Sequence, residues 1–115
     1  MIVFGELYLA KVYYKGTTGP YKERPVLIVD DSEYETGLIT FAELTGTEPN
    51  NPPKYFDKFK VEIHDWKTTG LDEQSWVKCY IGNIHRVHKS RMLKKIGAVN
   101  LGVMTEVLEK IINQK

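Results

Sequence analysis

The segment Tyr21-Lys-Glu-Arg-Pro-Val-Leu-Ile-Val-Asp-Asp31 decides how the rest of this sequence is interpreted. Four apolar residues follow Pro25, and such a run between polar segments is typical of a buried strand. Proline has no amide hydrogen, so it fits the first residue of a strand better than the middle. The pattern predicts a strand at residues 25–29 that follows a polar loop, with Arg24 directly before the first residue of the strand. An arginine held there offers a rigid fork of donors to a phosphate or a carboxylate.

The segments on either side predict further strands and one helix. We expect strands at residues 5–14, 37–44, 55–63, 76–81 and 90–97. Residues 15–23 are expected to form a loop, and residues 83–89 a short ordered turn. The apolar positions change parity between Leu9 and Val12, which predicts a bulge or bend near Ala10. Asn100 is a good helix N-cap, and apolar residues then recur every three or four positions, as in an amphipathic C-terminal helix of about three to four turns.

Short strands followed by one helix predict a mainly β fold, a small curled antiparallel sheet or barrel. The 115 residues are expected to form a single domain, 1–115. Since no apolar run approaches about 18 residues and the first residues lack a basic region, we expect neither a membrane span nor a signal peptide, and a cytoplasmic protein. Cys79 lies in an alternating strand pattern, which favours a packed thiol over a nucleophile.

Charge is distributed unevenly along the chain. Residues 1–73 contain eight Lys and Arg against thirteen Asp and Glu, whereas residues 78–95 contain six Lys and Arg and no acid. Such a basic segment, which also holds His85 and His88, could bind an anionic partner. It could equally be a lysine-rich edge strand exposed to solvent. The sequence leaves both interpretations open.

Several kinds of site can be excluded from the residues. His85 and His88 have no further ligands at suitable spacing, so we expect no metal site. Gly16 and Gly19 lie between strands and not before a helix, which argues against a phosphate-binding P-loop. A polar set remains at the expected strand ends, which lie close together in a small barrel: Thr17, Thr18, Arg24, Thr45, Thr47, Asn83, Arg86 and Lys89. Arginines, hydroxyls and amides without a metal suit a phosphate-centred substrate, although Thr45 could equally cap a turn and Arg86 could be an ordinary surface charge.

Three strand segments occur in the order and spacing of a known family. They are Gly5-Glu-Leu-Tyr-Leu9, Glu23-Arg-Pro-Val-Leu-Ile-Val29 and Leu38-Ile-Thr-Phe-Ala-Glu-Leu-Thr45. Together they resemble the MazF/PemK toxins of type II toxin–antitoxin systems. The late segment at residues 83–97 and the C-terminal helix resemble the same family, so the likeness covers most of the chain.

The resemblance implies an SH3-like antiparallel barrel of the CcdB/PemK type that forms a homodimer. It implies a metal-independent, sequence-specific endoribonuclease without a cofactor, whose single-stranded RNA crosses a groove and whose cognate antitoxin occupies the same groove. Matched position by position, Arg24 is expected to stabilise charge on the reacting phosphate and Thr45 to hold a phosphate oxygen. The residues then expected to contact RNA are Thr17, Thr18, Lys22, Thr47, Asn83, Arg86 and Lys89.

The chain also departs from the family pattern. Tyr21, Lys22 and Glu23 stand where many members have glycines before the arginine, and Asn83 stands where a glutamine is common. His88 replaces an acidic residue. The catalytic pair of the family is therefore kept, whereas the residues of the groove that would choose the RNA sequence do not match the family closely.

Two other functions fit the same fold. A CcdB-like toxin would bind DNA gyrase, but that mode relies on an exposed Trp-Gly-Ile terminus, and this chain ends Ile112-Asn-Gln-Lys115. A catalytically silent SH3-like binding module would keep the barrel and bind partners without cutting RNA.

Overall fold

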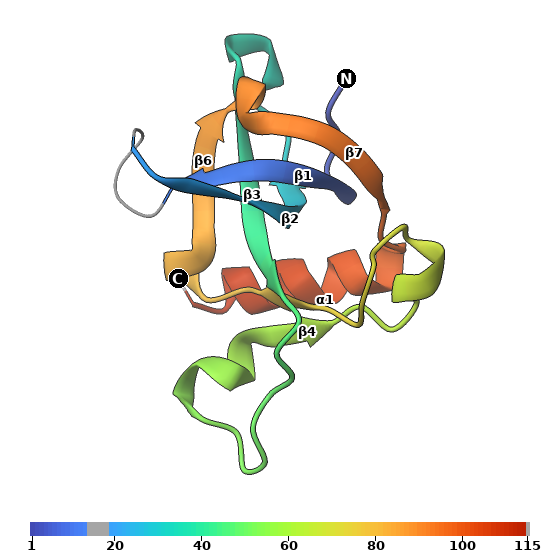
Figure 1. The fold of residues 1–115 in the computed structure, drawn as a ribbon. Coiled ribbons are helices and arrows are strands. Elements are labelled where there is room, and N and C mark those ends of the chain that lie inside the picture. The colour runs from blue at the N-terminus through green and yellow to red at the C-terminus, as the bar shows by residue number, and fades with distance from the viewer. Residues whose placement is uncertain (14–18, 115) are drawn as a thin grey trace.

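The structure, a computed structural model, describes residues 1–13 and 19–114. These residues form a seven-stranded antiparallel sheet and a C-terminal helix (Figure 1). The elements are β1 (Glu6–Tyr13), β2 (Tyr21–Asp30), β3 (Leu38–Thr45), β4 (Lys60–Glu62), β5 (Trp76–Lys78), β6 (Ile84–His88), β7 (Met92–Ala98) and α1 (Leu101–Ile112). The predicted mainly β fold with a terminal helix is confirmed.

The sheet is curled rather than flat. Its strand order is β4-β5-β3-β2-β1-β7, and β6 pairs with the first part of β3. β6 and β7 are consecutive in the chain but lie against β3 and β1, so the sheet bends toward itself in a barrel-like form without complete closure (Figure 1).

Both faces of β2 are buried, which explains its continuous apolar run. Leu27 packs into one core with Leu44, Val77 and the helix residue Val107. The side chains of Val26, Ile28 and Phe41 pack into a second core on the opposite face. Side chains alternate between faces along a strand, so a strand between two cores needs apolar residues at every position.

The predicted helix and its N-cap are confirmed. The Asn100 side chain accepts a hydrogen bond from the Val103 amide at 2.9 Å. Val103, Met104 and Val107 are buried and hold the helix against the first core.

The second strand begins earlier than predicted. Residues 21–24 belong to β2, and the register pairs Tyr21 with Tyr13 and Arg24 with Ala10 of β1. The Tyr13 and Tyr21 rings lie 5.4 Å apart, a cross-strand aromatic contact that stabilises this extension. Pro25 is accepted inside β2 because pairing with β3 starts only at the next residue, Val26.

Three other predicted segments differ from the structure. Residues 55–59 form a 3₁₀ helix, η2 (Tyr55–Phe59), because Phe56 and Phe59 are spaced by three and not by two, and only Lys60–Glu62 forms a strand. The expected turn at residues 83–89 contains β6, which pairs with β3. As a polar edge strand with few apolar residues, β6 lacks the alternation that marks a strand in the sequence. The strand predicted at residues 76–81 ends at Lys78.

A register shift lies between Leu9 and Ala10, where a bulge was predicted. The pairs Leu9–Lys94 and Ala10–Met92 show that the extra residue is Leu93 of β7 and not a residue of β1.

Cys79 is a packed thiol, as predicted. Its side chain is fully buried, and burial raises the pKa of Cys79 to about 12, so the thiolate is disfavoured. No helix among the described residues is long and apolar enough to cross a membrane.

The N-cap gives a first prediction. Asn100→Ala removes the acceptor of the Val103 amide, and we expect the free energy of unfolding to fall by about 1 kcal/mol. Urea-induced unfolding followed by circular dichroism measures this change. Asn100→Ser should retain most of the stability because serine also caps helices. An equal loss in the serine and alanine variants would contradict the capping role.

Candidate nucleic-acid interface

The candidate site lies where β2 and β3 stop pairing. The last pair in this ladder is Val26 with Glu43, and the same register carried two residues farther sets Arg24 across from Thr45. A cavity of about 930 Å³ opens there, and both side chains line it together with Pro25 and Thr47. The structure therefore brings together the two residues that the sequence predicts to be catalytic.

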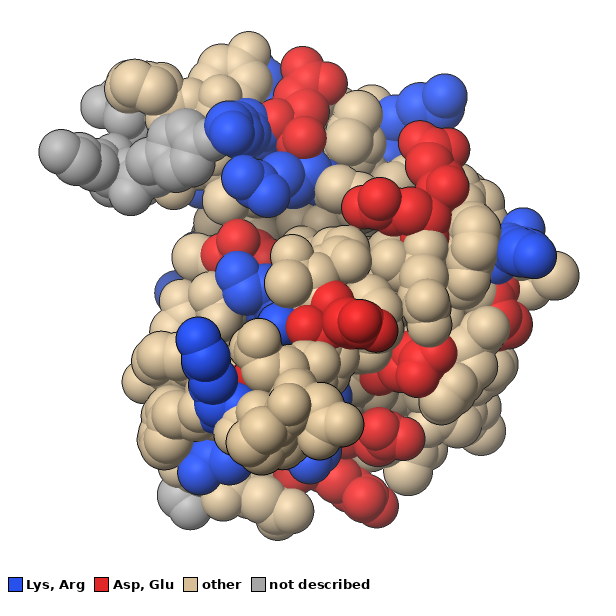
Figure 2. Space-filling view, turned by 60° about the horizontal axis from the view of Figure 1, so that its bottom comes forward, with Lys and Arg blue, Asp and Glu red and all other residues tan. Residues whose placement is uncertain are grey.

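A second cavity of about 430 Å³ adjoins the first at Thr45. It is lined by Lys78 and by Asn83, which the sequence also places in the site. We call the two cavities together the groove. Figure 2 shows the molecule hollowed on one side, with Lys and Arg atoms above and below the hollow and an acidic group at its lower edge, while most of the other visible Asp and Glu atoms lie away from it.

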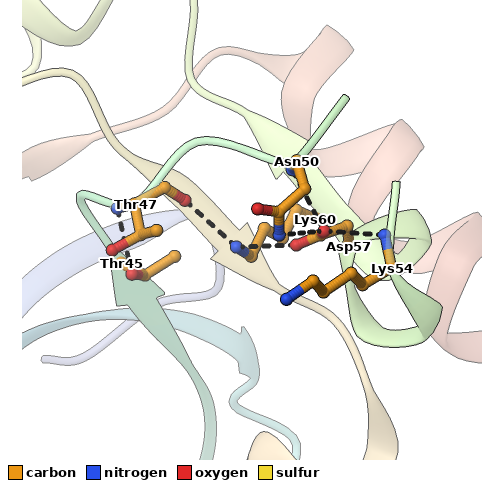
Figure 3. A network of polar contacts seen from close by, with 6 residues as sticks. All are labelled: Thr45, Thr47, Asn50, Lys54, Asp57 and Lys60. Atoms are coloured by element: carbon orange, nitrogen blue, oxygen red, sulfur yellow. Dashed lines mark hydrogen bonds and ion pairs between the residues drawn. The ribbon is translucent and has the colours of Figure 1, made fainter. Parts of the chain in front are cut away.

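Thr45 and Thr47 are held by hydrogen bonds at the centre of the groove. The Thr45 Oγ1 accepts from the Thr47 amide at 3.1 Å, and the Thr47 carbonyl accepts from Lys60 Nζ at 3.1 Å (Figure 3). Because Thr45 acts as an acceptor in the first bond, its hydroxyl hydrogen is not used there and can be donated to a ligand oxygen.

A charged cluster that the sequence did not predict lies beside Arg24. The Glu43 carboxylate and His85 Nε2 are 2.6 Å apart, and the Glu43 side chain is largely buried. The hydrogen bond from His85 lowers the pKa of Glu43, burial opposes the shift, and the nearby charges of Lys78 and Arg24 lower it further. A largely buried carboxylate is thus kept ionised next to the arginine.

The first cavity has walls of both charges. Lys94 and Lys95 enter it from β7, and Asp72 and Glu73 enter it from the segment before β5. The Glu73 carboxylate lies so close to the chain that a Cβ added at Gly46 would sit 2.3 Å from its Oε1. Glu73 therefore lies beside Thr45 and Thr47, and Arg24, Lys94 and Lys95 supply the positive charge of this cavity.

Two predicted contacts lie away from the groove. Arg86 is paired with Thr40 in the sheet, at the opposite end of β3 from Thr45, and its guanidinium binds both Glu33 oxygens at 2.6 and 2.7 Å. Lys89 lies 4.2 Å from the centre of the Tyr34 ring. Neither residue lines the two cavities.

The remaining predicted contacts are on or beside the first hairpin. Lys22 is two residues from Arg24 on β2 and therefore on the same face of that strand. Thr17 and Thr18 lie outside the described residues. Within residues 1–13 and 19–114, no group of three or more His, Cys, Asp or Glu is arranged to hold a metal ion.

Comparison with known proteins gives one family and a consistent fold. Residues 4–114 match the family model described as PemK-like, MazF-like toxin of type II toxin–antitoxin systems. No curated protein sequence matches this chain.

Solved structures of similar fold include proteins from two bacterial groups. The Mycobacterium tuberculosis toxin MazF-mt6 is 21% identical with a TM-score of 0.68, over 94% of this chain and 93% of that one. MazF from Deinococcus radiodurans is 18% identical with a TM-score of 0.70, over 96% and 93%. A mycobacterial endoribonuclease in complex with its cognate antitoxin is 17% identical with a TM-score of 0.71, over 98% and 93%. At these identities the likeness establishes the fold.

The Glu43 cluster predicts a particular dependence of stability on pH. The pKa of Glu43 is lower in the folded protein than the unfolded value of about 4.3, so its ionised form stabilises the fold above that pH. This stabilisation is lost as the pH falls through the folded-state pKa. We therefore expect Glu43→Gln to destabilise the protein most near neutral pH, and progressively less as the pH falls below about 4.3.

Urea unfolding of the wild type and the variant across this pH range measures the difference. Glu109→Gln, exposed on α1, serves as the matched control and should lie close to the wild type at every pH. A difference for Glu43→Gln that stays constant with pH would refute the stabilising ionisation.

Proposed function

Because this chain belongs to the family of PemK-like, MazF-like toxins of type II toxin–antitoxin systems, we propose that it is a sequence-specific, metal-independent endoribonuclease acting on single-stranded RNA. The observation that carries the proposal is the shared cavity of Arg24 and Thr45, which come from neighbouring strands. A guanidinium and a hydroxyl in a groove are the donors that a phosphate needs when negative charge develops on its oxygens.

The proposed reaction uses the RNA's own 2′-hydroxyl. Its oxygen attacks the adjacent phosphorus, the bond to the 5′ oxygen breaks, and the products are a 2′,3′-cyclic phosphate and a 5′-hydroxyl. Arg24 stabilises the charge of the phosphorane and gives a proton to the leaving 5′ oxygen, and it regains that proton from solvent. Thr45 donates a hydrogen bond to a nonbridging oxygen. No metal takes part in this scheme.

The Glu43–His85 pair is the proposed acceptor of the 2′-hydroxyl proton. Neither group lines the two cavities, but Glu43 lies two residues before Thr45 on the same face of β3 and within the electrostatic reach of Arg24. The two groups share a hydrogen bond of 2.6 Å. Imidazole and carboxylate side chains are the most frequent general bases in enzymes. The pair thus supplies the one role that Arg24 and Thr45 leave unfilled.

The proposed partners follow from the family. One similar structure is a complex of an endoribonuclease with its cognate antitoxin. We infer a small cognate antitoxin whose tail occupies the groove, a homodimeric toxin and a cytoplasmic site of action.

Alanine variants of two arginines, one inside and one outside the groove, offer a matched test of the proposal. Arg24→Ala should lower the cleavage rate of single-stranded RNA in EDTA roughly a hundredfold or more, because a charge-stabilising donor is lost. Arg86→Ala removes the same side chain at a position outside the groove and should leave the rate within a few-fold of the wild type. Primer extension on the treated RNA gives both the rate and the cut site.

The outcomes of this test are distinct. Unchanged cleavage by Arg24→Ala would refute the assignment of the catalytic residue. Complete absence of cleavage by the wild type, with a folded protein that still binds an antitoxin, would instead favour the silent binding module.

The proton acceptor gives a separate prediction. His85→Asn keeps a polar side chain but cannot take a proton, and we expect single-turnover cleavage to slow by about a hundredfold or more. The affinity for RNA should change little, since the variant retains Arg24 and Thr45. A loss of affinity with an unchanged rate constant at saturation would assign His85 to RNA binding.

A further inference from the structure

Four aromatic rings gather at the outer end of the groove. Tyr55, Phe56 and Phe59 come from η2, and Tyr80 directly precedes the 3₁₀ helix η4 (Ile81–Asn83). The Phe56 ring centre lies 4.7 Å from that of Tyr80 and 5.0 Å from that of Tyr55. Tyr55 is 60% exposed and Phe56 is 57% exposed. We call these four residues the aromatic platform.

The platform is held in place by a buried carboxylate. Asp57, within η2, accepts hydrogen bonds from the amides of Asn50 and Lys54 and from the Asn50 side chain at 2.7 to 3.0 Å (Figure 3). Lys60 binds the other Asp57 oxygen at 3.0 Å and also reaches the Thr47 carbonyl. These contacts, the side chain of Asn50 first and then the backbone amide of Lys54, lower the pKa of Asp57, so it stays ionised at neutral pH. The exposed rings are therefore carried by a fixed backbone.

The platform is continuous with the groove. Phe56 and Tyr80 line the second cavity, and Thr45 lines that cavity and the one that contains Arg24. A Cβ added at Gly82 would lie 2.8 Å from a Tyr80 ring carbon, so this ring rests directly on the backbone. A ligand whose phosphate lies at Arg24 and Thr45 would extend onto these rings.

The charge around the platform matches a polyanion. Lys58 Nζ lies 4.3 Å from the centre of the Tyr55 ring. Lys54 and Lys60 flank η2, and Lys78 lines the second cavity. The one acid within η2, Asp57, is already bound by Lys60 and by amides. Lysines interleaved with aromatic faces repeat the alternation of phosphates and bases along a nucleic acid strand.

We propose that the aromatic platform, with Phe56 at its centre, stacks an unpaired nucleobase of the RNA whose reacting phosphate lies at Arg24 and Thr45. The inference rests on the proposed function and extends it to the recognition of substrate. Single-stranded RNA fits because only unpaired bases can leave their neighbours and stack on protein rings. The platform thereby fixes which phosphate of a bound strand lies next to Arg24.

The test compares RNA affinity among ring variants. Short 2′-O-methyl RNA oligonucleotides, which lack the attacking hydroxyl, are titrated with protein and followed by fluorescence anisotropy. We expect Phe56→Leu to weaken binding roughly tenfold, whereas Phe56→Tyr, which keeps the ring, should bind like the wild type. The matched control is Phe4→Leu, because Phe4 is 48% exposed and its amide binds Asp31, at the other end of β2 from Arg24.

The salt dependence of RNA binding distinguishes a contribution from stacking from an electrostatic one. Raising the KCl concentration should weaken the wild type and Phe56→Leu in parallel, so that the ratio of their dissociation constants stays constant. A ratio that collapses toward one at high salt would overturn the stacking role. Thermal unfolding of each variant verifies that the fold is retained.

The remaining outcomes distinguish the platform from the proposed reaction. Unchanged RNA affinity in Phe56→Leu, while the wild type still cuts RNA and Arg24→Ala does not, would overturn the platform alone. Loss of antitoxin binding with unchanged RNA binding would overturn it in favour of a protein-docking surface. Weakened binding by Phe56→Leu, in a protein that cuts no unmodified RNA, would support the platform and overturn the endoribonuclease.

Discussion

The pairing of β2 with β3 ends at Val26 and Glu43, and the groove depends on that end. Pro25 has no amide hydrogen to donate to β3, so the ladder cannot continue through it. Arg24 nevertheless remains on a rigid strand, because β1 pairs with it through Ala10. Pro25 thus ends the pairing of β2 with β3, while the pairing of β2 with β1 continues and holds Arg24. An arginine fixed in this way loses less conformational entropy when it binds a phosphate.

The change from core to site occurs along one face of β3. Ile39 and Phe41 point into the second core, and Glu43 and Thr45 follow on the same face. A carboxylate at the edge of a core must find partners, because burying an unpaired charge is costly. For Glu43 these partners come from three other strands, which bring His85, Lys78 and Arg24. The cluster therefore satisfies the charge of the buried Glu43 carboxylate, and it also sets the electrostatic surroundings of Arg24.

Sequence reasoning recovered the strand that carries Arg24 and the residue across from it, because apolar runs, breakers and family segments mark them locally. It missed Glu43, because the role of a single acidic residue in an apolar strand can be inferred only when β5 and β6 are known to lie beside it. It placed Arg86 with the site because residues 83–89 were expected to form a turn at a strand end, whereas Arg86 lies within β6 and binds Glu33, which is distant in sequence. It treated residues 55–59 as a strand, which concealed a short helix that presents aromatic rings.

The way the charges are paired limits how this chain can attract a polyanion. The basic segment 78–95 suggests a broad positive surface, but Arg86 is bound to Glu33 and Lys95 to Glu6 at 2.5 Å. The net charge of the sequence is only +1. A long-range field is therefore weak, and exposed charges beyond about 8 Å are screened at physiological salt. Under the proposed function, affinity for RNA then comes from short-range contacts, and the donors of the groove and the aromatic platform are their proposed sources. Such contacts depend on the fit of an unpaired strand, and this favours selective binding over general adhesion to nucleic acid.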